Sequence, residues 1–168
     1  MELFHDHVHK AMRLMDDLVD LEIEKVDAIL AKVNADPEEE DVKRVERELW
    51  KKIRKKGLDG RRTGLGITAE GDMLAALGLT YGSDKAIDFS VNVQKNLAVE
   101  AYRSSVTMAK ERGAFPIFSA EREALNPMID RIKEADPALY ELMVKYERRK
   151  KRRIYICRNS NLYGGKIY

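Results

Sequence analysis

The chain has 168 residues and a formal net charge of +2, with 36% charged and only 7% aromatic side chains. Its length fits one domain, and its many helix-forming residues and few prolines predict a mainly α-helical fold. The single Cys157 excludes an intrachain disulfide and a cysteine-rich zinc site, and it fits a reducing cytoplasm. No apolar run approaches the ~20 residues of a membrane span, and the N-terminus lacks the pattern of a signal peptide. We therefore expect a cytoplasmic protein without a membrane partner.

Residues 3–34 are predicted to form one long helix. Its apolar positions follow each other in heptad-like steps of four and three: Val8, Met12, Met15, Val19, Val26, Ile29 and Val33. Such a seam packs either on a neighbouring helix of the same chain or on a second copy in a coiled-coil dimer.

Two groups of polar residues on this helix could be considered for a metal site. The first consists of three histidines spaced by two, which splays them around a helix: His5, His7 and His9. The second consists of three acids that include i,i+3 and i,i+4 pairs: Asp16, Asp17 and Asp20. A metal site would need further ligands from elsewhere, so a solvated acidic face is favoured and no metal ligand is assigned.

A second helix is predicted over residues 38–56, opened by Asp36-Pro37 and stopped by Gly57. Its apolar stripe is thin, with Val42, Val45, Leu49 and Ile53. Acids stand at its start and bases at its end, which follows the helix dipole. We expect it to form a surface hairpin with the first helix, and a nucleic-acid role for its basic end is the alternative.

The stretch RRTGLGITAEGDMLAALGLTYGS, from Arg61 to Ser83, is the least charged part of the chain. It predicts an extended piece at Thr63–Thr68, with strand character if any, and then a short helix around Met73–Leu77. Thr68 is the expected N-cap of that helix, Gly78 its C-cap, and a turn follows at Tyr81–Ser83. The spacing of its glycines matches neither the dinucleotide fingerprint nor a phosphate loop.

The remaining elements are predicted from their caps. Ser83 opens a helix that Gly113 ends, and its apolar arc exceeds half the circumference, which calls for neighbours on two sides. Ser119, Asn126-Pro127 and Asp136-Pro137 open short helices over 120–125, 127–134 and 137–147. Arg148 to Arg153 form a basic run, and Ile154–Cys157 is a possible short strand.

The Arg61–Ser83 stretch resembles the RRxGLGxxxxxDMLxxLGxxYGS segment of ribonucleotide reductase large subunits, above all in the adenosylcobalamin-dependent class. MRLMDDLVDLEIEKVDAIL before it, and EAYRSSVTMAKERGAFP and ADPALYELMVKYERR after it, resemble the flanking helices of that class. The resemblance covers about residues 1–149. It implies a helical slice of a ten-stranded α/β barrel, followed by a divergent basic tail at 150–168 that we expect to be disordered.

The chemistry that the resemblance implies cannot be placed on this chain. The family forms a thiyl radical with adenosylcobalamin and needs a radical cysteine beside Asn and Glu, a further pair of cysteines and a Pro-Thr-Gly-Thr phosphate loop. The sequence instead ends in ERRKKRRIYICRNSNLYGGKIY, with Cys157 alone. We therefore assign no catalytic, cofactor-binding or metal residue, and adenosylcobalamin and the ribonucleotide substrate belong to the intact family.

Two hypotheses from different classes follow. The first is a reductase fragment that is inactive alone, whose partner is the remainder of the reductase chain or a second copy bound through helix 3–34. The alternative is a free-standing helical interaction module whose basic tail binds nucleic acid, with Arg and Lys on phosphates and Tyr155 and Tyr163 on bases.

Overall fold

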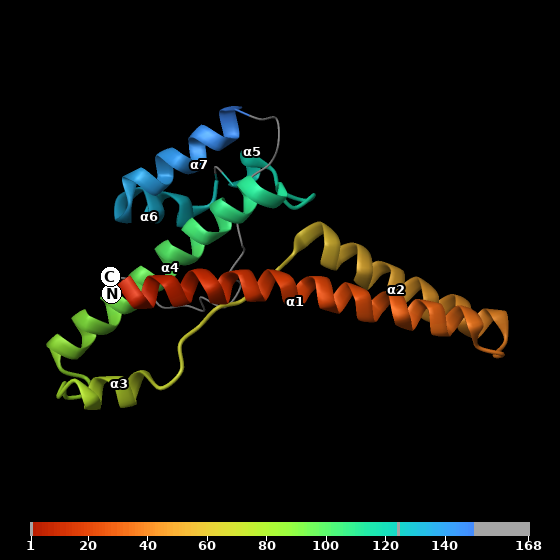
Figure 1. The fold of residues 1–168 in the computed structure, drawn as a ribbon, viewed down its shortest axis with the longest axis horizontal. Coiled ribbons are helices and arrows are strands. Elements are labelled where there is room, and N and C mark those ends of the chain that lie inside the picture. The colour runs from red at the N-terminus through yellow and green to blue at the C-terminus, as the bar shows by residue number, and fades with distance from the viewer. Residues whose placement is uncertain (1, 124, 150–168) are drawn as a thin grey trace.

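The computed structural model describes residues 2–123 and 125–149 (Figure 1). Its elements are helices: α1 (Glu2–Ala35), α2 (Glu40–Gly60), α3 (Glu70–Ala76), α4 (Asp84–Arg112), α5 (Ala120–Glu123), α6 (Pro127–Ala135) and α7 (Pro137–Arg149). The predicted mainly α-helical fold is confirmed. No strand is present within the described residues, so strand character at Thr63–Thr68 is not found. The possible strand at Ile154–Cys157 and the tail at 150–168 lie outside the described residues.

α1 and α2 form the predicted hairpin, which projects from the rest of the molecule as an arm (Figure 1). The outer part of α1 buries Val19, Val26 and Val33 of the predicted seam and also Ile23, which the prediction left out, whereas Ile29 is half-buried. Arg54 of α2 donates to both carboxylate oxygens of Asp27, at 2.6 and 3.1 Å, and ties the two helices together. The α1 seam is therefore used inside the chain.

α2 begins later and ends later than its sequence signals predict. The Asp36 carboxylate accepts a hydrogen bond from the Glu38 amide at 3.1 Å, so it closes a local turn, and the helix starts only at Glu40. Gly57 does not stop the helix, which continues to Gly60. A Cβ on Gly57 would lie 2.9 Å from Cδ1 of Ile23, so this glycine lets α2 lie close on α1.

α4 is the central helix and has neighbours on two sides, as its wide apolar arc predicts. Towards α1 it buries one cluster: Val8, Met12, Leu97, Ala101 and Met108. Towards α6, α7 and the link that precedes α5 it buries a second: Tyr102, Val106, Phe115, Phe118, Ile132, Leu139 and Met143. The two clusters share α4, so this helix joins the arm to the C-terminal helices.

The predicted caps of three helices are found in place. The Ser83 hydroxyl accepts from the Ala86 amide at 3.4 Å, and Gly113 ends α4 with a φ of 88°. The Asn126 side chain accepts from the Met128 amide at 3.1 Å, and the Asp136 carboxylate accepts from the Leu139 amide at 2.9 Å. α5 spans Ala120–Glu123, and Leu125, the last residue of the predicted range, lies in a turn. None of the described helices combines the length and the apolar character that crossing a membrane requires.

Candidate functional site at the glycine-rich segment

The glycine-rich segment, residues 61–69, leaves α2, crosses α1 as open chain and leads into α3 (Figure 1). Its side chains alternate in burial. Thr63 is buried, and Leu65 and Ile67 pack on the cluster between α1 and α4, whereas Gly64, Gly66 and Thr68 are exposed. Alternation with a period of two is the pattern of a β-strand with one covered face. The segment thus has the side-chain pattern of a strand without being part of a sheet in the described chain.

Each end of the segment is fixed by a non-glycine residue in the left-handed region. Arg61 has a φ of 38° and Ala69 a φ of 60°. This conformation costs about 1–2 kcal/mol for an ordinary residue, so packing and side-chain contacts must hold it. Ala69, and not the predicted Thr68, stands before the first residue of α3, and Thr68 remains exposed.

The end of α3 and the turn after it, which follow the glycine-rich segment, agree with the prediction. α3 ends in a Schellman motif, in which the Leu79 amide donates to the Leu74 carbonyl at 2.9 Å and the Gly78 amide to the Ala75 carbonyl at 3.0 Å. Gly78 has the required positive φ of 69°. In the following turn the Ser83 amide donates to the Thr80 carbonyl at 3.1 Å, which leads directly into α4.

An ion-pair cluster anchors the start of the segment, and we define it as Asp16, Asp17, Asp20, Arg61 and Arg112. Arg61 donates to the Asp16 carboxylate at 2.7 Å and to its backbone carbonyl at 2.9 Å, and to Asp20 at 2.6 Å. Arg112, at the end of α4, donates to Asp16 at 2.6 Å and to Asp17 at 2.8 Å. The cluster therefore joins α1, the end of α2 and the end of α4 at one point.

The charges in this cluster stabilise each other. The hydrogen bond to Asp20, and next the bond to Asp16, raises the pKa of Arg61 although burial opposes the shift. The hydrogen bond from Arg61 lowers the pKa of Asp20, and the bond to Asp17 raises the pKa of Arg112. The carboxylates therefore favour the charged form of both guanidinium groups.

The three aspartates bring carboxylate oxygens within 4.8 Å of one another, which is close enough for a metal ion. The guanidinium groups of Arg61 and Arg112 occupy these oxygens, so the arrangement is an ion-pair network. The predicted solvated face is confirmed for Asp17 and Asp20, which are exposed, but it is wrong for Asp16, of which only 2% is exposed. The sequence did hold a sign of this burial: Asp16 is four residues after Met12 and three before Val19, so it lies on the same apolar face of α1.

The three histidines point to separate partners. His5 contacts the Asn96 amide oxygen at 2.9 Å, and His9 contacts the Glu100 carboxylate at 2.7 Å. His7 is exposed, and its ring contacts the Leu3 carbonyl at 2.6 Å. The splaying argument holds for neighbours spaced by two, but it overlooked that His5 and His9 are four apart and share the face towards α4.

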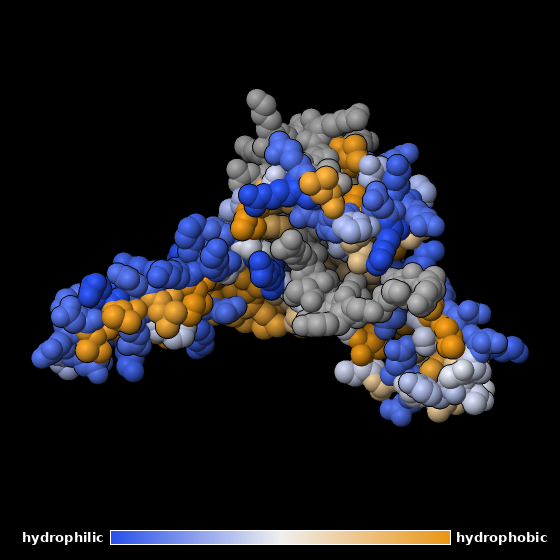
Figure 2. All heavy atoms as spheres, turned by 180° about the vertical axis from the view of Figure 1, so that it is seen from behind, coloured by the Kyte–Doolittle hydropathy of each residue, from blue (hydrophilic) through white to orange (hydrophobic). Residues whose placement is uncertain are grey.

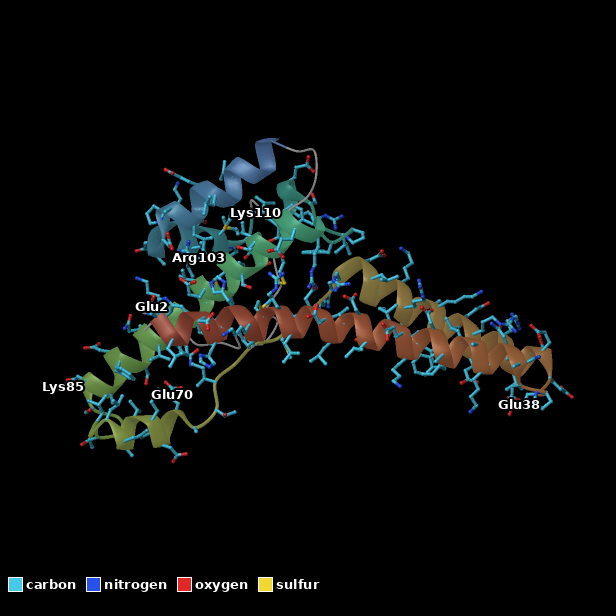
Figure 3. All side chains as sticks on the ribbon, viewed as in Figure 1. Glu2, Glu38, Glu70, Lys85, Arg103 and Lys110 are labelled. Carbon is cyan, nitrogen blue, oxygen red and sulfur yellow. The ribbon has the colours of Figure 1, made fainter. Side chains whose placement is uncertain are left out.

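His9 belongs to a chain of polar contacts that leads across α4. Glu100 is buried, and its carboxylate also accepts from Arg103 at 3.2 Å. Arg103, labelled in Figure 3 between α4 and the C-terminal helices, donates to Asp136 at the start of α7. These contacts link α1 to α7 through α4.

Comparison with known proteins places these elements in a family. Residues 1–153 match the family model described as ribonucleotide reductase, barrel domain. Over 64 residues, or 38% of this chain, it is 38% identical to vitamin B12-dependent ribonucleoside-diphosphate reductases of two Mycobacterium tuberculosis strains. Over 65 residues, or 39% of the chain, it is 34% identical to a ribonucleoside-diphosphate reductase subunit alpha of Chlamydia pneumoniae.

The matched segment spans 9% of the length of each mycobacterial relative and 6% of the chlamydial one. No solved structure matches the chain. The family model nevertheless covers all of the described residues, including the arm, the glycine-rich segment and the helices that follow. The chain therefore belongs to the ribonucleotide reductase family and corresponds to part of its large subunit.

Proposed function

We propose that this chain forms part of the catalytic barrel of an adenosylcobalamin-dependent ribonucleotide reductase and that it is not active by itself. One observation carries the proposal. The side chains of the glycine-rich segment alternate in burial as in a strand, and the segment lies within the residues that match a reductase barrel domain. In the intact protein, residues 63–68 would be one strand of an α/β barrel. Helices α1 and α4 would cover the outer face of that strand, because Leu65 and Ile67 already pack on them.

Gly66 supports this role for the segment. It lies in no left-handed turn, and a Cβ added to it would meet nothing within 4 Å. The described chain therefore gives no reason for a glycine at this position, whereas close approach of a neighbouring strand or of a bound molecule would give one.

The assignment to the adenosylcobalamin-dependent class rests on the names of the mycobacterial relatives. The residues present here do not fit that cofactor's chemistry, because the sequence has one cysteine, Cys157, and the family needs three. The radical cysteine, the reducing cysteines and the phosphate loop would have to come from the rest of the large subunit. We also propose a cytoplasmic location, because a sequence with a single cysteine fits a reducing compartment.

An activity assay tests this proposal. We expect the 168-residue chain to reduce none of the four ribonucleoside diphosphates or triphosphates, even with adenosylcobalamin and a dithiol. A longer protein, expressed from the continuous reading frame around this gene segment with the cysteines and the phosphate loop, should show cofactor-dependent turnover. The control for the isolated chain is its circular dichroism spectrum, which should show folded helices.

Two outcomes would contradict the proposal. Turnover by the isolated chain that disappears in a Cys157→Ser variant would show that the tail carries chemistry. A complete gene that encodes only these residues, beside unrelated genes, would favour the free-standing module.

Substitution of two glycines gives a second test with opposite expected signs. Gly66→Ala should leave the isolated chain as stable as before or stabilise it by about 0.4–1 kcal/mol, because the unfolded chain loses freedom and nothing clashes. Gly82→Ala should destabilise it by about 1–2 kcal/mol, because Gly82 has a φ of 79°. Urea denaturation measures both values. In an active longer protein, we expect Gly66→Ala to impair turnover, and unchanged turnover would argue against a crowded barrel strand.

A further inference from the structure

The middle of the glycine-rich segment is held on α1 by apolar contacts, which do not depend on one exact position. Leu65 and Ile67 are only half-buried where they pack on the cluster between α1 and α4. α1 also offers apolar side chains outside this cluster, at Leu14, Leu18 and Leu21. Figure 2 shows hydrophobic side chains following one face of the arm from its tip towards the body. Because the hydrophobic effect is non-directional, apolar packing alone does not determine where along α1 the segment lies.

A shift of the segment along α1 would change what each of its faces presents. Thr63, Leu65 and Ile67 alternate with Gly64 and Gly66. A slip by one residue would turn the apolar side chains away from the helices. A slip by two would keep the apolar face but replace each side chain by its neighbour on that face. A strand that pairs with further strands, as the proposed function requires, needs one fixed position.

Arg61 fixes the start of the segment by a forked contact with one turn of α1. Its side chain is only 11% exposed, and Nε donates to the Asp16 carboxylate at 2.7 Å. The two remaining nitrogens donate to the Asp16 backbone carbonyl at 2.9 Å and to the Asp20 carboxylate at 2.6 Å. We call these three contacts the Arg61 clamp. A planar guanidinium holds its donors in a rigid fork, so the clamp does not tolerate sliding as apolar contacts do.

The elements around the clamp are held by further contacts. The Asp59 carbonyl, in the last turn of α2, accepts from the Ile117 amide at 3.0 Å, which ties the end of α2 to the link between α4 and α5. Arg112, at the end of α4, shares the Asp16 carboxylate with Arg61 at 2.6 Å. The clamp therefore belongs to a frame of three helices that does not move with the segment.

The two ends of the segment separate the role of the clamp from that of the backbone turn. Arg61 and Ala69 both have a positive φ, of 38° and 60°, which glycine adopts without strain. The Ala69 methyl group is exposed and makes no polar contact, and the Ala69 carbonyl accepts from the Met73 amide of α3 at 3.0 Å. Glycine would thus relieve strain at both ends, but only at residue 61 would it remove a clamp.

We propose that Arg61 is a positioning residue, whose clamp fixes the place of residues 63–68 on α1 and α4. With the clamp, the segment is ordered in the isolated chain, so little conformational entropy remains to be lost when a neighbouring strand pairs with it. Without the clamp, the segment leaves its place while the helices stay folded. That the segment is a barrel strand rests on the proposed function. The clamp itself is tested on the isolated chain, so an inactive longer protein would not count against it.

Nuclear magnetic resonance relaxation of the full 168-residue chain tests the clamp. The backbone amides of Gly64 and Gly66 report the order of the segment. Their order parameters should be about 0.85 in wild type, as in rigid backbone, and should fall below about 0.6 in Arg61→Gly. The amides of α2 and α4 should keep their wild-type order parameters, because the effect is local.

Ala69→Gly is the matched control, because it introduces the same residue at the other left-handed position. It should leave the order of Gly66 at the wild-type value. If backbone strain alone mattered, the two glycine substitutions would act alike. Asp17→Ala is a second control, because Asp17 belongs to the same ion-pair cluster but accepts from Arg112. The segment should stay ordered in this variant as well.

Labelling of a buried thiol extends the test to slower motions. Thr63 is 7% exposed, so Thr63→Cys together with Cys157→Ser provides a single thiol on the covered face of the segment. Adding Arg61→Gly to this chain should speed the reaction of the thiol with a maleimide at least about tenfold, under conditions in which the helices stay folded. Circular dichroism checks that the helix content is the same in both chains.

Three outcomes would overturn the proposal. Order parameters and a labelling rate that both stay unchanged in Arg61→Gly would show that apolar packing is sufficient to place the segment. Low order parameters in the wild-type chain would show that the clamp does not hold it. An equal loss of order in Ala69→Gly would assign the effect to the backbone at the two ends and not to the side chain of Arg61.

Discussion

Asp16→Ala is expected to lower the free energy of unfolding by about 3–5 kcal/mol, because it removes the shared partner of two partly buried arginines. Asp16 is buried and accepts from Arg61 at 2.7 Å and from Arg112 at 2.6 Å. Without it, both guanidinium groups keep only the more exposed Asp20 and Asp17. Arg61 also holds the left-handed turn that opens the glycine-rich segment, so that strain would lose its main support. Urea denaturation followed by circular dichroism measures the loss.

Asp17→Ala is the matched control, because it removes the neighbouring carboxylate of the same cluster. The Asp17 side chain is exposed, and its single bond to Arg112 is screened by water, so about 1 kcal/mol or less should be lost. Asp16→Asn keeps the size of the side chain and should cost nearly as much as alanine if charge is what matters. Equal effects of Asp16→Ala and Asp17→Ala would show that the burial of Asp16 has no energetic consequence.

The helix boundaries that could be predicted are those fixed by local contacts. Ser83, Asn126 and Asp136 each accept a bond from an amide two or three residues ahead, and no distant group is needed for this. Gly57 shows why other boundaries could not be predicted. It looks like a helix stop, but its missing side chain serves the close contact with Ile23 on α1. Whether a glycine ends a helix or admits a neighbour depends on residues far away in the sequence.

In the candidate site, too, the features set by local sequence could be predicted and those that depend on distant residues could not. The alternation of Thr63, Leu65 and Ile67 can be read from the sequence, and the structure places them against α1 and α4 as one covered face. A sheet, by contrast, needs partner strands, and the described residues supply none. The ion-pair cluster joins residues that lie far apart in the sequence: Arg61 is 45 residues from Asp16, and Arg112 is 96 residues from Asp16. Only the position of Asp16 on an apolar seam indicated that such partners should exist.

Leu139→Ala is expected to lower the free energy of unfolding by about 2–5 kcal/mol, because the change leaves a cavity in the apolar cluster that α7 forms with α4 and α6. Leu139 has no exposed surface and packs among Tyr102, Val106 and Ile132. Since α4 also contributes Leu97 and Met108 to the cluster with α1, the loss should reach the arm as well. Trp50, the only tryptophan, lies on α2 and reports the state of the arm by fluorescence.

We therefore expect the urea transitions followed by circular dichroism and by Trp50 fluorescence to coincide in wild type and to shift together in Leu139→Ala. Leu125→Ala is the control, because the same change at a side chain that is 85% exposed should alter stability by about 0.5 kcal/mol or less. A dichroism transition that moves while the Trp50 transition stays would mean that the arm folds independently of the C-terminal helices. In that case the contacts between α1 and α4, including the Asp16 network, would not couple the two halves of the chain.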